Sequence, residues 1–254
     1  MTPFCINDED FADLPEITKR IRYCLLNKVG FSLVRIGDAE NQVMAQGYII
    51  PDNVIQKIWW AENEDWTGIR LPNFEARDRL IDSIKEADIV GVLHQSEAYV
   101  WKPLTEKIFT FCQIKPRQIC YAFINVYFPD SLEFIKLLKK YGLLIIGKQG
   151  WQFASLLKNT FGIEPRGIIS ISSYNEIPLV LTKTEKIDFD LAIISAGSNA
   201  IILATAIARQ GKVALDFGRA IHPQFWQKYS LHMHNPVNTY NVSQPLIHDN
   251  FPSD

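Results

Sequence analysis

The amino-acid sequence predicts an α/β fold in which a mostly parallel sheet is flanked by helices. Short apolar runs alternate with longer amphipathic stretches along most of the chain, and several runs end in glycine or another small residue. Many of the runs are continuously apolar, as expected for strands that are covered on both faces. Such alternation is typical of strand–helix–strand crossovers, which produce parallel sheets.

The chain is long enough for one large hydrophobic core. Its 254 residues allow a core that buries roughly three quarters of the unfolded surface. We expect a single domain over residues 1–234. Residues 235–254 are rich in Pro, Asn and Ser, and we expect a coil-like tail there.

Charge and cysteine content narrow the range of functions. The formal net charge is −2 and the basic residues form no stripe, which argues against nucleic acid as a partner. No apolar run is long enough to cross a bilayer, and the N-terminus is acidic where a signal peptide would be basic. The four cysteines show no metal-ligand spacing. We therefore expect a cytoplasmic protein with reduced thiols, no transmembrane segment and a small polar ligand; a homo-oligomer stays open.

The elements can be assigned in order. Asp13 can cap a first helix over 13–29, in which Ile17, Ile21 and Leu25 recur at helical spacing. A strand over 31–36 follows, and a short helical stretch then runs toward Gly47. The remaining predicted helices cover 51–63, 75–86, 100–112, 131–141, 151–161 and 199–210, and the remaining strands cover 87–93, 119–124, 143–146, 167–171, 191–195 and 213–215.

The first strand ends in a chemically suggestive sequence, RIGDAE, which includes Arg35, Gly37, Asp38 and Glu40. Two carboxylates of this kind can face one hard cation, and a cation that bridges two phosphates offsets the charge of a nucleotide diphosphate. The alternative is that Asp38 caps the next helix and Glu40 lies in its first turn. The spacing alone favours the cap.

Two further strand ends carry small or basic residues. Gly197, Ser198 and Asn199 lie between a strand and a helix, where exposed amides and the Ser198 hydroxyl suit a phosphate group. Gly147 precedes Lys148, whose ammonium group suits phosphate as a point charge. A tight turn and a solvated loop lysine are the ordinary alternatives. Because the carboxyl ends of parallel strands share one edge, all three ends are expected at one cleft.

These blocks resemble the GT-D type of bacterial glycosyltransferase. RIGDAE at 35–40 is similar to the family's RFGDGE signature, and GKVALDFG at 211–218 is similar to its KGYxALDIGH block. The turn at 195–198 lies between them in the same order as in the family. The resemblance extends from about Arg20 to His222.

The resemblance implies a Rossmann-like three-layer fold that binds a nucleotide sugar. It also implies that Asp38 and Glu40 serve a divalent metal, Mn²⁺ or Mg²⁺, and the diphosphate. Members of such a family move a hexose, typically glucose from UDP-glucose, onto a sugar or glycan acceptor. The chain departs from the family at Ala39, Ser198 and Arg219, which leaves the donor and the acceptor undefined.

An inverting transfer also needs a base for the acceptor hydroxyl. Asp216 is the first candidate, with Glu40 and His222 behind it; a turn role for Asp216 is the alternative. His232 and His234 form an H-x-H pair without further zinc ligands nearby. A non-catalytic nucleotide-sugar-binding or glycan-binding module and another Rossmann-type transferase, such as a methyltransferase, remain alternative functions.

Overall fold

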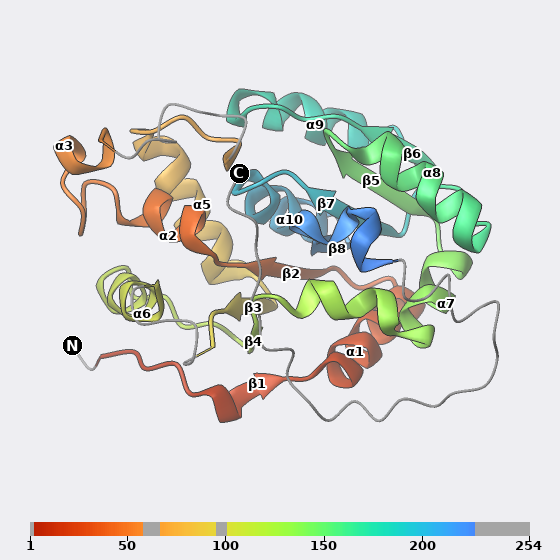
Figure 1. The fold of residues 1–254 in the computed structure, drawn as a ribbon, viewed down its shortest axis with the longest axis horizontal. Coiled ribbons are helices and arrows are strands. Elements are labelled where there is room, and N and C mark those ends of the chain that lie inside the picture. Colours follow the sequence, from red (N-terminus) through yellow and green to blue (C-terminus); the bar gives the residue numbers. More distant parts are fainter. Residues whose placement is uncertain (1–2, 58–66, 95–100, 227–254) are drawn as a thin grey trace.

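The computed structural model describes residues 3–57, 67–94 and 101–226. Their strands form one sheet in the order β1-β4-β3-β2-β8-β7-β5-β6, and all the paired strands are parallel (Figure 1). The strands are β1 (Phe11–Ala12), β2 (Phe31–Arg35), β3 (Ile89–Val92), β4 (Ile119–Tyr121), β5 (Leu143–Gly147), β6 (Gly167–Ile169), β7 (Leu191–Ser195) and β8 (Val213–Asp216). The predicted parallel α/β fold is confirmed.

Helices connect these strands. They are α1 (Leu14–Asn27), α2 (Asp38–Ala45), α3 (Asp52–Ile55), α5 (Phe74–Glu86), α6 (Trp101–Phe111), α7 (Leu132–Lys140), α8 (Gly150–Phe161), α9 (Ile177–Thr184) and α10 (Asn199–Arg209), with short 3-10 turns at Asp8–Asp10, Ile124–Asp130, Tyr174–Glu176, Gly218–Ile221 and Pro223–Phe225. Asp13 caps α1 through a hydrogen bond from the Glu16 N–H, as its sequence predicts.

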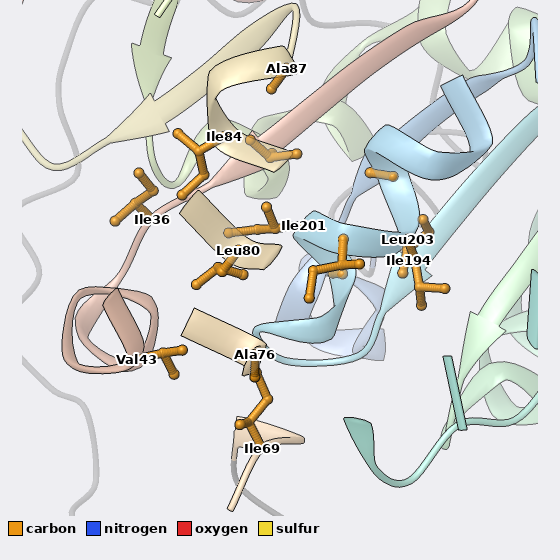
Figure 2. Packing of buried hydrophobic residues seen from close by; sticks show 14 of the residues in the cluster. Ile36, Val43, Ile69, Ala76, Leu80, Ile84, Ala87, Ile194, Ile201 and Leu203 are labelled. Atoms are coloured by element: carbon orange, nitrogen blue, oxygen red, sulfur yellow. The ribbon is translucent and has the colours of Figure 1, made fainter. Parts of the chain in front are cut away.

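Helices cover both faces of the sheet because successive strand residues point to opposite sides. Phe31 and Leu33 of β2 pack with α1, α7 and α8, whereas Val34 joins a second apolar cluster with α2, α5 and α10. Figure 2 shows this second cluster, in which Val43 of α2, Leu80 of α5 and Ile201 of α10 converge. The molecule therefore has three layers, and β2 is buried between the outer two.

Some predicted elements differ from those in the structure. The strand predicted over 119–124 ends at Tyr121, and a 3-10 turn that contains Pro129 follows. The helix predicted over 51–63 is confined to Asp52–Ile55 in the described residues. Helix α9 was not predicted because the continuous apolar run IPLVL hides the helical spacing of its buried residues Ile177, Val180 and Thr184. The predicted tail and the histidine pair at 232 and 234 lie outside the described residues.

Two expectations from composition can be compared with the structure. All four cysteines are free, and burial raises the pKa of the Cys120 thiol to about 12. Within the part of the chain that the structure describes, no helix has the length and apolar character needed to cross a membrane.

The end of β2 is a switch point of the sheet. This strand has β3 on one side and β8 on the other. Helix α2, which follows β2, packs on one face of the sheet, whereas the 3-10 turn Gly218–Ile221, which follows β8, packs on the other. In open α/β sheets, ligands bind at the carboxyl edge at such a switch point. The fold thus brings the acids that follow β2 to the expected position of a ligand.

Replacement of Leu80 by alanine tests the packing of α5 onto the sheet. Leu80 is fully buried, so Leu80→Ala should lower the free energy of unfolding by about 2–5 kcal/mol. Leu179→Ala is the matched control, because Leu179 on α9 is 55% exposed, and it should change stability by less than about 0.5 kcal/mol. Chemical denaturation measures both; equal losses would contradict the described packing.

Candidate active site

Arg35 at the end of β2 ties three strand ends together. Its Nη2 lies 2.9 Å from Asp216 Oδ1, its Nε donates to the Asp216 carbonyl at 3.0 Å, and its Nη1 donates to the Ala122 carbonyl at 3.2 Å. Asp216 ends β8, and Ala122 directly follows β4. The planar guanidinium group suits this fixed, multi-pronged arrangement better than an ammonium group would.

Asp216 is enclosed by these contacts. Its residue is 4% exposed, and Oδ1 also accepts a hydrogen bond from the Gly218 N–H at 3.1 Å. Gly218 has a φ of 44°, and a Cβ there would collide with the Arg35 guanidinium. Burial raises the pKa of Asp216, and Arg35 partly offsets that effect. An acceptor hydroxyl has little access to this carboxylate, so its geometry suits a positioning role rather than that of the predicted base.

Glu40 connects the start of α2 to the turn after β7. Its Oε2 accepts the Gly37 N–H at 2.9 Å, and its Oε1 accepts the Ser198 hydroxyl at 2.8 Å. The predicted capping alternative is therefore realised in a changed form: Gly37 is the N-cap residue and Glu40 reaches back to it. Ser198, predicted as a phosphate ligand, instead holds Glu40 in this structure.

Negative charge accumulates around Glu40. Burial raises its pKa, nearby Asp216 raises it further, and the hydrogen bonds from Ser198 and Gly37 offset part of the increase. A raised carboxyl pKa means that the charged form is disfavoured at this place. A cation bound here would relieve that repulsion.

Asp38 differs from Glu40 in exposure. It is the first residue of α2 and is exposed, and its Oδ1 accepts the Ala39 N–H at 2.9 Å. Residues two apart on a helix do not face each other. Among the described residues, no three His, Cys, Asp or Glu side chains form a metal-binding group. The two acids thus fit a hard cation only if ligand oxygens and water complete its coordination, as is common for Mg²⁺.

The turn at the start of α10 is covered by residues 67 and 68, and no sequence pattern predicted this contact. The Ser198 N–H donates to the Thr67 carbonyl at 2.9 Å, and Asn199 Nδ2 donates to the Gly68 carbonyl at 2.8 Å. Gly197 has a φ of 54°, and a Cβ there would collide with Thr67. These groups of Ser198 and Asn199 therefore already have partners within the chain.

The third predicted strand end lies farther along the same edge. Gly147 ends β5, where it is paired with Ser195 of β7, and Lys148 follows in an exposed position. Strand β5 is three strand positions from β2, which corresponds to about 14 Å. The fold places Lys148 on the predicted edge at this separation from the acids.

Comparison with known proteins identifies relatives of this fold. The GT-D fold-like domain family matches residues 12–223. Comparison with curated proteins gave no match. Among solved structures, a domain of unknown function 1792, described as having a distinct glycosyltransferase fold, is 18% identical with a TM-score of 0.57, over 87% of this chain and 82% of that one. A glycosyltransferase from Streptococcus sanguinis that contains this domain is also 18% identical, with a TM-score of 0.55, over 84% and 83%.

Removal of the guanidinium group tests the clamp at this edge. Arg35→Met leaves the Asp216 carboxylate buried without its charged partner, so it should lower the free energy of unfolding by about 3–5 kcal/mol near pH 8. Without Arg35, the folded-state pKa of Asp216 lies further above its unfolded value. Protonation of Asp216 therefore stabilises the folded variant in acid, and this contribution is lost as the pH rises. The destabilisation should therefore be smaller near pH 5.

Lys136→Met is the matched control for this substitution. Lys136 pairs with Glu133 at 2.7 Å, but both side chains are largely exposed, so no measurable change is expected. Denaturation of both variants at the two pH values checks the expectation. A pH-independent loss in Arg35→Met would show that Asp216 is not the group left unpaired.

Proposed function

The chain belongs to the GT-D-like family, and from this premise we propose that it is a glycosyltransferase that moves a hexose from a nucleotide diphosphate sugar to a sugar or glycan acceptor. UDP-glucose or a close relative is the proposed donor. The glycosyltransferase fold of its structural neighbours supports a transfer reaction. The single observation that carries the proposal is the gathering of Asp38, Glu40 and Asp216 at the switch point of the sheet.

The acids have separate parts in this proposal. Asp38, which is exposed, would hold a Mn²⁺ or Mg²⁺ ion together with the diphosphate, and Glu40 would be the second carboxylate. When bound, such an ion stabilises the negative charge that develops on the departing diphosphate. Gly37 and Ser198 keep Glu40 oriented through its two oxygens, so little reorganisation is needed when the charge develops.

The other predicted residues supply the support for the donor. Lys148 lies along the edge from the acids, at a separation that a diphosphate with its nucleoside can span, and would attract the phosphate or nucleoside end. The Arg35 guanidinium already donates hydrogen bonds to Asp216 and to the Ala122 carbonyl. It would therefore hold the strand ends beneath the site in position and would not bind phosphate. Gly147 and Gly197 permit the close strand-end turns on which this support depends.

Two conservative substitutions test the proposed metal and diphosphate site. Asp38→Asn and Glu40→Gln remove one negative charge each with little change of shape. Each should reduce Mn²⁺-dependent UDP binding and hexose transfer at least about a hundredfold, because the developing phosphate charge loses its counter-ion. Isothermal titration with UDP, with and without Mn²⁺, and a UDP-release assay provide the measurements.

Asp82→Asn provides the matched control for these variants. Asp82 is an exposed carboxylate on α5, so its loss changes the net charge equally but should leave binding and transfer intact. Full activity in both site variants would refute the proposed site. Binding of UDP without turnover of any donor in the wild-type protein would favour a non-catalytic nucleotide-sugar-binding module.

A further inference from the structure

A histidine that the sequence did not single out lies at the same edge of the sheet. His94 follows β3, and its Nε2 lies 3.2 Å from Asp8 Oδ2. The imidazole side chain is 46% exposed, whereas the Asp8 side chain is 20% exposed. A histidine that is held by a carboxylate and still reachable from solvent is a common arrangement for a general base.

The N-terminal segment delivers Asp8 to this position by running antiparallel to α6. The Phe4 N–H donates to Thr110 Oγ1 and the Ile6 N–H donates to Glu106 Oε1, so the segment advances toward the start of the helix. There Asp8 Oδ1 lies 3.7 Å from Lys102 Nζ, whose side chain is 11% exposed. Lys102 thus places a positive charge beside the carboxylate that holds the imidazole.

Strand register places His94 and Asp38 at matching positions after neighbouring strands. Arg35 of β2 is paired with Gly91 of β3, and the Ile36 N–H donates to the Gly91 carbonyl at 2.8 Å. Asp38 and His94 each follow that pair by three residues. Neighbouring strands lie about 4.8 Å apart, so the segments that follow β2 and β3 leave the sheet side by side.

A hydrogen bond also connects α6, which carries Lys102, to α2, which begins at Asp38. Thr105 Oγ1 of α6 donates to Asn41 Oδ1 of α2 at 2.8 Å, and both residues are buried. Helix α2 begins at Asp38, and α6 carries Lys102 in its first turn. Asp38 and Lys102, the lysine next to Asp8, therefore lie on two helices that are hydrogen-bonded to each other.

Aromatic side chains form a wall next to the imidazole. The ring of Phe11 lies 6.3 Å and that of Tyr121 lies 6.5 Å from the His94 ring, and Phe123, which is 40% exposed, lies 5.6 Å from Tyr121. Aromatic rings pack well against the C–H faces of sugar rings. The wall and the base together are suited to a sugar that presents a hydroxyl group.

On this basis we propose that His94 is the general base of the transfer reaction and that Asp8 is its positioning residue. This inference rests on the proposed glycosyltransferase function. His94 Nδ1 takes the proton of the acceptor hydroxyl, and the hydroxyl oxygen forms a bond to the anomeric carbon of the donor. The bond from that carbon to the diphosphate oxygen breaks, and the nucleotide diphosphate leaves with the electron pair. The anomeric configuration is inverted.

The test uses the full-length protein with UDP-glucose, Mn²⁺ and a panel of free mono- and disaccharides as acceptors. His94→Gln should lower kcat for transfer at least about a hundredfold, as expected for loss of a general base. The KM for UDP-glucose, the affinity for UDP and the melting temperature should stay unchanged. Asp8→Asn should also lower kcat, and added imidazole should restore part of the activity of His94→Gly, which a purely structural role would not explain.

His222→Gln is the matched variant. His222 is the other histidine in the described part of the chain and is half-buried after β8; because it was also predicted as a base, His222→Gln tests the competing assignment. Full transfer by His94→Gln, or loss of transfer in His222→Gln alone, would overturn the assignment of His94 while leaving the proposed function standing. Absence of transfer in the wild-type protein across the panel would instead refute the proposed function, and the assignment of the base with it.

Discussion

The buried ion pair between Arg35 and Asp216 joins the ends of β2 and β8, which are neighbours in the sheet although they are far apart in the sequence. Pairs of this kind pay for their contacts with desolvation and are weak evidence for stability. Their geometric effect here is clearer. The guanidinium group contacts the ends of β8 and of β4 at once, and Gly218 must lack a side chain for the contact to form. The relative height of these strand ends follows from that contact.

Charge balance then constrains what can bind at the edge. Arg35 neutralises Asp216, while Glu40 and Asp38 remain as further acids beside the same strand end. The positive end of the α2 dipole offsets part of this charge. A nucleotide diphosphate would bring additional negative charge to an edge that already disfavours it. A divalent cation between the acids and the phosphates would resolve this conflict, which is the physical reason for the proposed metal dependence.

Local sequence patterns were sufficient for much of the fold and for part of the site. The apolar run that ends at Gly37 predicted β2 and the acids behind it, and Asp13 predicted the start of α1. Long-range partners could not be predicted in this way. Thr67 covers the Ser198 amide from a distant part of the chain, and Asp8 reaches His94 only because the N-terminal segment packs along α6. Such contacts depend on how helices pack on the sheet, and no residue spacing encodes them.

The position of β2 separates the proposed donor side of the site from the proposed acceptor side. On one side of it lie β8, β7 and β5, whose ends carry Asp216, Ser198 and Lys148; on the other lies β3, which leads to His94. In a displacement that inverts the anomeric carbon, the base and the leaving group lie on opposite faces of the sugar. A donor that spans the β8 side with its diphosphate would present the anomeric carbon near the end of β2. The acceptor would then approach from the β3 side, where the histidine and its aromatic wall are found.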